Sequence, residues 1–258
     1  MKRILLLKIQ KKALKEEPTA MRDHTKEFVR LVAESFDCPG PIYEFGSFQV
    51  EGQEQYADLR SLFPGRKYVG CDMRPGLGVD MVQDVSSMSL GTGTVGTILC
   101  IETFEHVFEI RKAFDEVFRV LKPGGLFIIT SPLNFRIHAY PDDYWRMTPN
   151  CLRRMLGPYE AKASGFQGYE KFPHTVMAVA RKSPAESDFA ERAMDLGKRF
   201  ERYLVGEEIA TNKSRRVKNF LSRLRRSKGE RYQMDNYFSA TFQVDHCQDM
   251  ASLRRQAG

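Results

Sequence analysis

Three acidic residues, Asp72, Asp84 and Glu102, each follow a short apolar segment of the sequence. Segments of this kind are typical of buried strands in an α/β sheet, and ligands of such sheets bind at the carboxyl ends of the strands. A carboxylate in this position can accept hydrogen bonds from a ribose diol. Three carboxylates at neighbouring strand ends favour a cationic ligand that carries a nucleoside, because they would repel the pyrophosphate of a dinucleotide.

A glycine follows the first of the apolar segments, in the order Glu44-Phe45-Gly46-Ser47. A glycine lets the backbone approach a ligand closely, and a helix that follows would present its N-terminus to that ligand. Gly46 and the next glycine do not have the Gly-x-Gly-x-x-Gly spacing, which argues against a nicotinamide dinucleotide. At each of these strand ends the structural alternative is a turn, a loop cap or an ion pair with a neighbouring cation.

A second group of reactive side chains lies between residues 102 and 149. Its candidate proton acceptors are His106, His138, Asp142 and Asp143. The same region contains aromatic and cationic side chains that suit a flat or glycosidic molecule: Tyr140, Tyr144, Trp145 and Arg146. The structural alternative is that Thr148 and Pro149 begin a helix, that an aspartate pairs with Arg146, and that His106 caps or packs.

The elements that must position these residues alternate between strands and helices. Apolar segments predict strands at residues 42–46, 68–71, 80–82, 95–101, 126–130 and 175–180. Helical periodicity predicts helices at residues 21–36, 53–62, 108–121 and 150–156, with an opening helical segment before residue 15. This alternation favours an α/β fold with a doubly wound, parallel sheet, in which the last strand can be antiparallel at the edge.

The composition divides the chain into three parts: N-terminal helices in residues 1–36, an α/β domain in residues 37–182, and a basic, mainly helical extension in residues 183–258. Helices are expected in the extension at residues 185–205 and 214–228, and nine of its basic residues fall between residues 213 and 231. The net charge of +7 is compatible with nucleic acid, phosphorylated molecules or anionic membrane, and does not select among them. We expect the helix at residues 214–228 to pack on the domain with a solvated basic face.

Five cysteines without a Cys-x-x-Cys pair indicate free thiols in a reducing compartment. No apolar segment approaches the ~18 residues of a membrane span, and residues 4–7 are too short for the core of a signal peptide. We therefore expect a cytoplasmic protein without a transmembrane segment.

Five segments of the sequence resemble the class I S-adenosylmethionine-dependent methyltransferases, in particular the small-molecule methyltransferases with a Glu-x-x-Glu-His-Val segment. They are Tyr43-Glu-Phe-Gly-Ser47, Val69-Gly-Cys-Asp72, Gln83-Asp-Val85, Cys100-Ile-Glu-Thr-Phe-Glu-His-Val107 and Arg119-Val-Leu-Lys-Pro-Gly-Gly-Leu126. The resemblance implies a Rossmann-like, mostly parallel, seven-stranded sheet with helices on both faces. Residues 142–149 also look like a segment of a subset of these enzymes that contains Asp-Tyr-Trp-Arg.

The resemblance implies that the cofactor is S-adenosylmethionine, with S-adenosylhomocysteine as product. Gly46 would border its methionine part, Asp72 would hold the ribose, and Asp84 with the Val85 amide would flank the adenine. The full set of expected cofactor-binding residues is Glu44, Gly46, Ser47, Asp72, Met73, Asp84, Val85 and Glu102. The sequence departs from the family at the first loop, where the usual acidic-x-Gly-x-Gly-x-Gly keeps only Gly46.

The function that we expect is methyl transfer to an oxygen or nitrogen atom of a small molecule or sugar, with His106, His138 and Asp143 as catalytic residues and no metal. Tyr140, Tyr144, Trp145 and Arg146 would contact the acceptor. One alternative is an RNA methyltransferase, since Glu102, Glu105, His106 and His138 resemble a two-Glu, two-His metal site of small-RNA terminal methyltransferases. Another is a non-catalytic binding subunit. Nucleic acid is not the favoured partner, and a homo-oligomer is compatible with the sequence.

Overall fold

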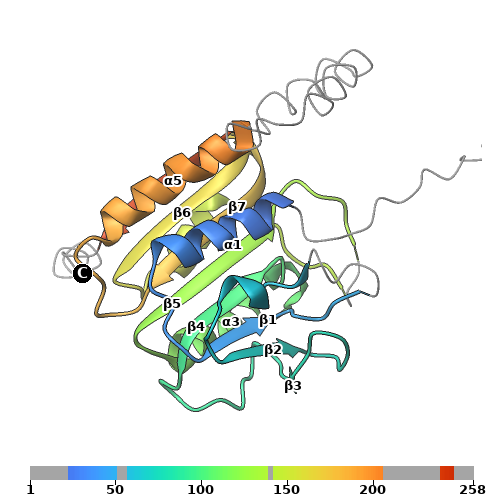
Figure 1. Cartoon of the computed structure of the whole chain (residues 1–258). Coiled ribbons are helices and arrows are strands. Elements are labelled where there is room, and N and C mark those ends of the chain that lie inside the picture. Colours follow the sequence, from blue (N-terminus) through green and yellow to red (C-terminus); the bar gives the residue numbers. More distant parts are fainter. Residues whose placement is uncertain (1–22, 51–56, 139–141, 206–238, 247–258) are drawn as a thin grey trace, which may run out of the picture.

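A computed structural model describes residues 23–50, 57–138, 142–205 and 239–246 of the chain. The described chain forms one eight-stranded sheet in the order β3-β2-β1-β4-β5-β7-β6-β8 (Figure 1). The strands are β1 Ile42–Phe45, β2 Tyr68–Asp72, β3 Met81–Val82, β4 Val95–Ile101, β5 Leu121–Pro132, β6 Ala161–Tyr169, β7 Phe172–Arg181 and β8 Ala240–His246. The strands from β3 to β5 pair in parallel, and β7 pairs antiparallel with both β5 and β6. The α/β class, the doubly wound sheet and an antiparallel late strand are thus confirmed.

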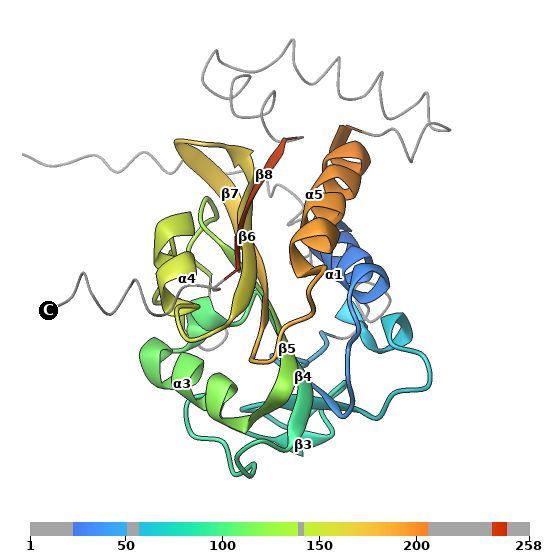
Figure 2. The ribbon, with the colours of Figure 1, turned by 90° about the vertical axis from the view of Figure 1, so that its left-hand side faces the viewer.

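Helices cover both faces of this sheet, as Figure 2 shows. One face carries α1 Asp23–Ser35 and α5 Phe189–Val205, and the other carries α3 Ile110–Val120 and α4 Pro149–Met155. Two short 3-10 turns, η1 Arg60–Leu62 and η2 Phe104–His106, follow β1 and β4 along the chain. The opening helical segment and most of the helix expected at residues 53–62 lie outside the described residues.

The apolar residues of β5 explain why the sheet needs helices on both faces. Leu126 and Ile128 belong to the core cluster under α1 and α5, whereas Phe127 and Ile129 belong to the cluster under α3 and α4. Successive side chains of a strand point to opposite faces, so a fully apolar strand is stable only when both faces are covered. The prediction of a buried strand at residues 126–130 is confirmed.

The Lys122-Pro123-Gly124-Gly125 segment does not separate α3 from β5 as a free loop. Leu121 already pairs with Val95, and Leu126 pairs with Thr97, so these four residues form an irregularity within β5. Gly124 has a φ of +71°, a conformation that glycine adopts without strain. The segment therefore acts as a bulge that lets the chain leave α3 and enter the sheet at once.

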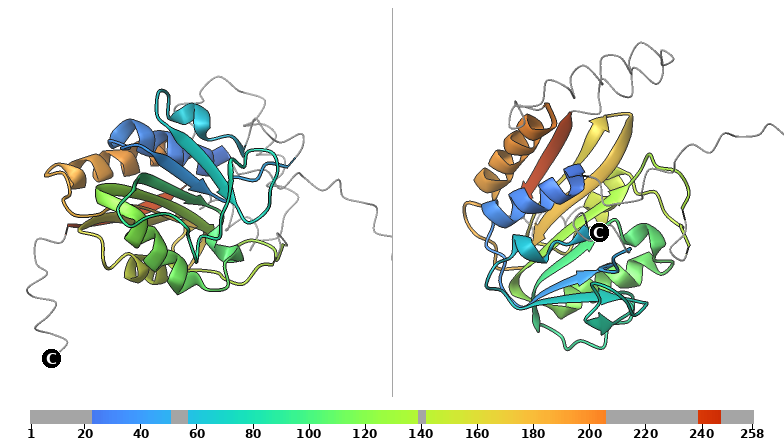
Figure 3. Two further views of the ribbon diagram at one scale, coloured as in Figure 1. Left: turned by 90° about the horizontal axis from the view of Figure 1, so that it is seen from below. Right: turned by 45° about the vertical axis from the view of Figure 1, so that its right-hand side comes forward.

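Two strands depart from the sequence-based expectation. β6 was not anticipated, because its alanines, serine and glycines carry little of the β-branched signal that identifies a strand. β8 lies in the extension expected to be mainly helical, and it pairs antiparallel with β6 beside α5, which makes the sheet eight-stranded rather than seven-stranded (Figure 3). The helix expected at residues 214–228 lies outside the described residues.

None of the helices in the described part of the chain is long and apolar enough to cross a membrane.

Candidate active site

The order of the strands places the candidate site at the carboxyl ends of β1, β2 and β4. The chain runs outward from β1 to β2 and β3, and then returns to β4 on the other side of β1. Phe45 at the end of β1 is level with Cys71 of β2 and with Cys100 of β4. Loops that leave a sheet at such a reversal point diverge and leave room for a ligand.

Gly46 occupies a position where only glycine fits. Its φ is +85°, and a Cβ atom there would collide with the Oγ1 atom of Thr103. The Thr103 hydroxyl donates to the Phe45 carbonyl at 2.9 Å, and the Gly46 amide donates to the Cys71 carbonyl at 2.8 Å. Gly46 is therefore required to bring the loops after β1, β2 and β4 together.

Two glycines outside the first loop allow close packing against it: Gly70 within β2 and Gly78 in the loop after β2. A Cβ atom on Gly70 would lie 2.7 Å from Ser47 Oγ, and one on Gly78 would collide with the Ser47 carbonyl. The Gln49 amide donates to the Leu77 carbonyl at 2.9 Å, which holds the two loops together. The departure from the family's first loop is thus accompanied by close backbone packing against the second.

Ser47 and Glu44 are both buried beside this junction. Among the described residues the Ser47 hydroxyl has no hydrogen-bond partner, although only 4% of the residue is exposed. Glu44 accepts a hydrogen bond from the Tyr68 hydroxyl at 2.7 Å, and burial raises the pKa of its carboxyl to about 7. Glu44 therefore has a structural partner within the sheet, whereas the Ser47 hydroxyl has none among the described residues.

The two aspartates expected to bind the nucleoside stand at the ends of β2 and β3. Asp72 is half-buried and accepts a hydrogen bond from the Arg74 amide at 3.0 Å, while its neighbour Met73 is exposed. Asp84 accepts hydrogen bonds from the amide and the hydroxyl of Ser86, both at 2.7 Å, through one oxygen atom, Oδ1. The loop-cap alternative for Asp84 is therefore realised at Oδ1. Val85 is buried in the core.

Glu102 ends β4 with an unusual backbone conformation. Its φ is +53°, and it is the non-glycine residue with a positive φ in the described part of the chain. The Glu102 amide donates to the Thr130 carbonyl at 3.0 Å, and the Thr130 hydroxyl lies 3.4 Å from Glu102 Oε1. Such conformations are retained mainly where the surrounding structure fixes a side chain at a functional position.

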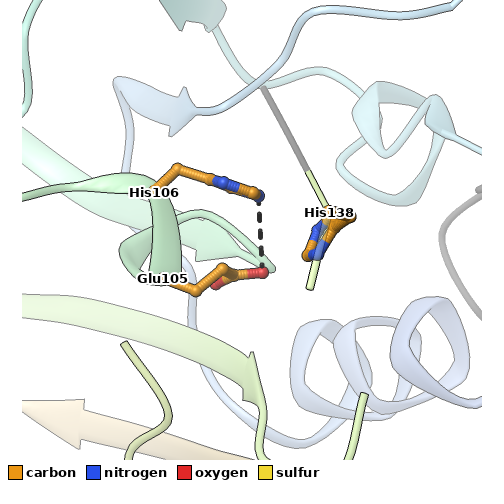
Figure 4. A group of neighbouring side chains, drawn as sticks. All are labelled: Glu105, His106 and His138. Carbon is orange, nitrogen blue, oxygen red and sulfur yellow. Dashed lines mark ion pairs between the residues drawn. The ribbon is translucent and has the colours of Figure 1, made fainter. Parts of the chain in front are cut away.

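Three further side chains from η2 and the loop after β5 converge beside Glu102. Figure 4 shows the Glu105 carboxylate and the His106 ring extending from η2 toward the His138 ring. The Nε2 atom of His106 lies 3.8 Å from Glu105 Oε1, and the two imidazole rings are 4.7 Å apart. His138 thus forms one polar cluster with Glu105 and His106, which lie 33 and 32 positions earlier in the sequence.

The ionisation of this cluster is dominated by burial. Burial, with the nearby Glu102 carboxylate, raises the pKa of Glu105 well above its usual range. Burial also lowers the pKa of His106, whose Nδ1 donates to the Asp142 carbonyl at 2.6 Å. Burial therefore disfavours the charged forms of both Glu105 and His106.

His138 is held from behind by Asp143. The Nδ1 atom of His138 lies 3.0 Å from Asp143 Oδ2, and the His138 amide donates to the same oxygen at 2.9 Å. Arg146 forms a bidentate ion pair with Asp143, as the sequence analysis noted. Although burial raises the pKa of Asp143, the hydrogen bonds from Arg146 and His138 outweigh it and hold the pKa at about 2.

Backbone hydrogen bonds hold Tyr144 and Trp145, in the loop before α4, against η2. The Glu105 carbonyl accepts hydrogen bonds from the amides of Tyr144 at 2.7 Å and Trp145 at 3.2 Å. The Trp145 indole donates to the Val107 carbonyl at 3.0 Å, so its polar atom has a structural role, while both rings remain partly exposed. Tyr140 lies outside the described residues.

Thr148 caps α4 by accepting a hydrogen bond from the Cys151 amide, with Pro149 at the first helical position, as expected.

Sequence reasoning did not single out Thr103, Thr130 and Ser131. The Thr103 hydroxyl donates to the carbonyl of Phe45, next to Gly46. The hydroxyls of Thr130 and Ser131 lie against the carboxylates of Glu102 and Glu105, at 3.4 Å and 3.3 Å. The signal that could have found the last two is their position at the carboxyl end of β5, level with the end of β4. Thr103 carries no such signal, because its contact with Gly46 depends on how β1 and β4 pair.

The described residues form a Rossmann-like α/β sheet whose polar strand ends gather at one edge. Residues 56–129, from the end of the first loop into β5, match a family model described as a methyltransferase domain. This match confirms the resemblance to the class I S-adenosylmethionine-dependent methyltransferases that the sequence motifs indicated.

Solved structures with similar folds have low sequence identity to this chain. The YcgJ protein of Bacillus subtilis is 13% identical, covers 60% of this chain and 98% of its own, and has a TM-score of 0.45. A methyltransferase from Archaeoglobus fulgidus that depends on S-adenosylmethionine is 14% identical, with coverages of 61% and 92% and a TM-score of 0.46. One from Thermotoga maritima, described as a possible histamine N-methyltransferase, is 14% identical, with coverages of 62% and 91% and a TM-score of 0.42. No curated protein sequence matches the chain.

Proposed function

We propose that this protein is an S-adenosylmethionine-dependent methyltransferase that acts on an oxygen or nitrogen atom of a small molecule or sugar. One observation carries the proposal: the strand-end carboxylates and the two imidazoles lie at the same edge of the sheet. Glu102 is the link between the two groups, because it ends β4 and is close enough to raise the pKa of Glu105. A cofactor held along β1, β2 and β4 would therefore have its acceptor on the side of His106 and His138.

The residues present fit the cofactor. The buried Ser47 hydroxyl, which has no partner among the described residues, and the Gly46 backbone would hold the methionine part. Asp72 would hold the ribose, and Asp84 with the Val85 amide would flank the adenine. The other expected contacts, Glu44, Met73 and Glu102, complete the set. When bound, S-adenosylmethionine supplies a methyl group on a cationic sulfur, and its transfer leaves neutral S-adenosylhomocysteine.

The chain's own contribution to the transfer is orientation and proton removal. Asp143 fixes the Nδ1 atom of His138 as a hydrogen-bond donor, which leaves Nε2 with a free lone pair. His138 would accept the proton of the acceptor at Nε2, and His106 would face the acceptor beside it. Tyr140, Tyr144, Trp145 and Arg146, on the loop before α4, would contact the acceptor.

Calorimetry with S-adenosylmethionine and S-adenosylhomocysteine tests the cofactor site. The wild-type protein is expected to bind both in the micromolar range, and Asp72→Ala is expected to lose that binding. Asp115→Ala, which changes an exposed aspartate on α3 outside the expected cofactor contacts, is the matched control and should bind like wild type. Absence of binding in the wild-type protein would contradict the proposal and favour a non-catalytic binding subunit.

A transfer assay with labelled cofactor then identifies the acceptor class. Panels of sugars and of small alcohols and amines are compared with bulk RNA at low and moderate salt. Label on the small molecules supports the proposal. Label on RNA that falls steeply with salt would instead support the RNA methyltransferase alternative, since phosphate contacts weaken with salt.

A further inference from the structure

We propose that Glu105, His106 and His138 form a binding site for one divalent transition-metal ion. No metal was expected from the sequence for the favoured function, although the RNA methyltransferase alternative rested on a resemblance of these residues and Glu102 to a metal site. The match to the methyltransferase family model assigns no metal. The existence of this metal site is independent of the proposed function. Only its role toward the acceptor rests on that function.

The first support is the convergence of three ligand types. Each of the three residues offers one ligand atom, and these atoms all lie within 4.8 Å of one another. Around a tetrahedral zinc ion with ligands at ~2.0–2.2 Å, ligand atoms are about 3.3–3.5 Å apart. Glu105 Oε1 and His106 Nε2, at 3.8 Å, are already near that spacing. Closing the site therefore requires small side-chain movements, mainly of His138 on its loop (Figure 4).

The second support is the arrangement behind the two imidazoles. His106 directs Nδ1 to the Asp142 carbonyl at 2.6 Å, and His138 directs Nδ1 to the Asp143 carboxylate at 3.0 Å. Histidines that bind metals commonly donate their other ring nitrogen to a carbonyl or a carboxylate in this way, which fixes the tautomer and the ring orientation. Both Nε2 atoms therefore keep a lone pair for an ion, and Asp143 is itself held by Arg146.

The third support is an unsatisfied oxygen atom. Glu105 is fully buried, its Oε2 accepts a hydrogen bond from Ser131, and among the described residues its Oε1 has no hydrogen-bond partner. A buried polar atom without a partner is destabilising by roughly 1–3 kcal/mol. The same oxygen atom is the one that faces His106 Nε2, so a bound cation would satisfy it.

Two imidazoles and one carboxylate determine the kind of ion. Imidazole nitrogen favours Zn²⁺, Fe²⁺ or Co²⁺ over the hard ions Mg²⁺ and Ca²⁺. Three protein ligands leave a coordination position open, as in catalytic rather than structural metal sites. An acceptor hydroxyl that occupies this position would have a lowered pKa and would lose its proton to solvent. In the metal-loaded protein the ion would thus replace His138 as the group that promotes loss of the proton.

Direct metal binding by the full chain tests the proposal. After removal of metals with a chelator, the wild-type protein is expected to bind one equivalent of Zn²⁺ in calorimetry, with at least ~100-fold weaker binding of Mg²⁺. Glu105→Gln and His138→Gln should each weaken Zn²⁺ binding by at least ~100-fold. Asp143→Asn, which changes the group behind His138, should weaken it by about 10- to 100-fold. His174→Gln, on β7 and outside the cluster, is the matched histidine control and should bind like wild type.

Co²⁺ substitution gives a readout that unfolding does not imitate. The wild-type protein should develop visible ligand-field absorption with one equivalent of Co²⁺, and Glu105→Gln should lack it while keeping the wild-type circular dichroism spectrum. Zn²⁺ binding that is absent in the wild type, or that all variants retain, would overturn the proposal. Titration with S-adenosylmethionine in the same samples separates the two proposals, because the metal site can be present without cofactor binding and the reverse.

Discussion

The Nδ1 atom of His138 lies 3.0 Å from Oδ2 of Asp143, a carboxylate that Arg146 holds from its other side. This relationship joins the loop after β5 to the segment that leads into α4. It fixes which nitrogen of His138 carries the proton, and so it bears on both the proposed base and the proposed metal ligand.

Asp143→Asn should reduce stability in a way that depends on pH. The pKa of Asp143 is about 2 in the folded protein, below its ordinary value of 3.8, so ionised Asp143 stabilises the fold. This contribution is fully present above about pH 4 and is lost as the pH falls toward 2. Urea unfolding should therefore show wild type more stable than the variant by roughly 2 kcal/mol at pH 6, with a smaller difference at pH 3.

The control for this experiment is Asp142→Asn, which changes the exposed neighbouring aspartate. Its stability difference from wild type should be small and should not vary over the same pH range. An Asp143→Asn difference that is constant between pH 3 and 6 would show that the ionised carboxylate is not what stabilises the loop.

Glu44→Gln should have the opposite dependence on pH. The pKa of Glu44 is raised to about 7 by burial, above its ordinary value of 4.5, so the folded protein favours the protonated form. Wild type should therefore lose up to roughly 3 kcal/mol of stability from this group as the pH rises from about 4.5 to 7. Glutamine can still accept the Tyr68 hydrogen bond, and the variant should lack this loss in urea unfolding at pH 5 and pH 7.5.

Asp115→Asn, on the exposed side of α3, is the matched control and should follow the pH profile of wild type. If Glu44→Gln loses as much stability as wild type between pH 5 and 7.5, Glu44 is ionised in the folded protein, and its carboxylate is then available to the cofactor.

Gly46→Ala should destabilise the junction of the first loops by about 2–4 kcal/mol in thermal or urea unfolding. The positive φ of Gly46 contributes part of the effect, and the collision with Thr103 contributes the rest. Gly93→Ala separates the two causes, since Gly93 has a φ of +68° and open space around its Cβ position. The Gly93→Ala variant should lose only about 1 kcal/mol of its free energy of unfolding.

A Gly46→Ala/Thr103→Ala double variant should be more stable than the sum of its single variants predicts, because the second change removes the colliding atoms. If the effects of Gly46→Ala and Thr103→Ala on the free energy of unfolding simply add, the loops after β1 and β4 can move apart. Close packing between Gly46 and Thr103 would then not constrain the site.

Phe242→Ala should show that the strand from the extension is part of the folded domain. Phe242 on β8 stacks on Phe28 of α1 at 6.0 Å and packs edge-on against Phe200 of α5 at 6.2 Å. Loss of this half-buried ring should lower the free energy of unfolding by about 2 kcal/mol in a single cooperative transition. Met194→Ala, an exposed residue of α5, should change it by less than about 0.5 kcal/mol. An unchanged stability for Phe242→Ala would place β8 outside the cooperative unit.

The local elements and the residues at their ends follow from the sequence alone. The alternation of apolar segments and helical periodicity predicted β1, β2, β4, β5 and their order with the helices, because side-chain periodicity and turn residues are properties of neighbouring positions. The same reasoning predicted that Gly46, Asp72 and Glu102 follow strands, and the Lys-Pro-Gly-Gly segment was among the five that resemble the methyltransferases. The role of Thr148 as a helix cap was also apparent, since the cap and its acceptor are three residues apart.

Which distant segments meet depends on the tertiary structure. In the folded protein the His138 ring packs against the His106 ring, and Glu44 accepts a hydrogen bond from Tyr68. Thr103 packs against Gly46, and β8 pairs with β6 at the edge of the sheet. These contacts join positions that are 24 or more residues apart, and each depends on the pairing and twist of strands between them. No local pattern encodes such a contact, because its free energy comes from packing and burial that exist only once the whole sheet has formed.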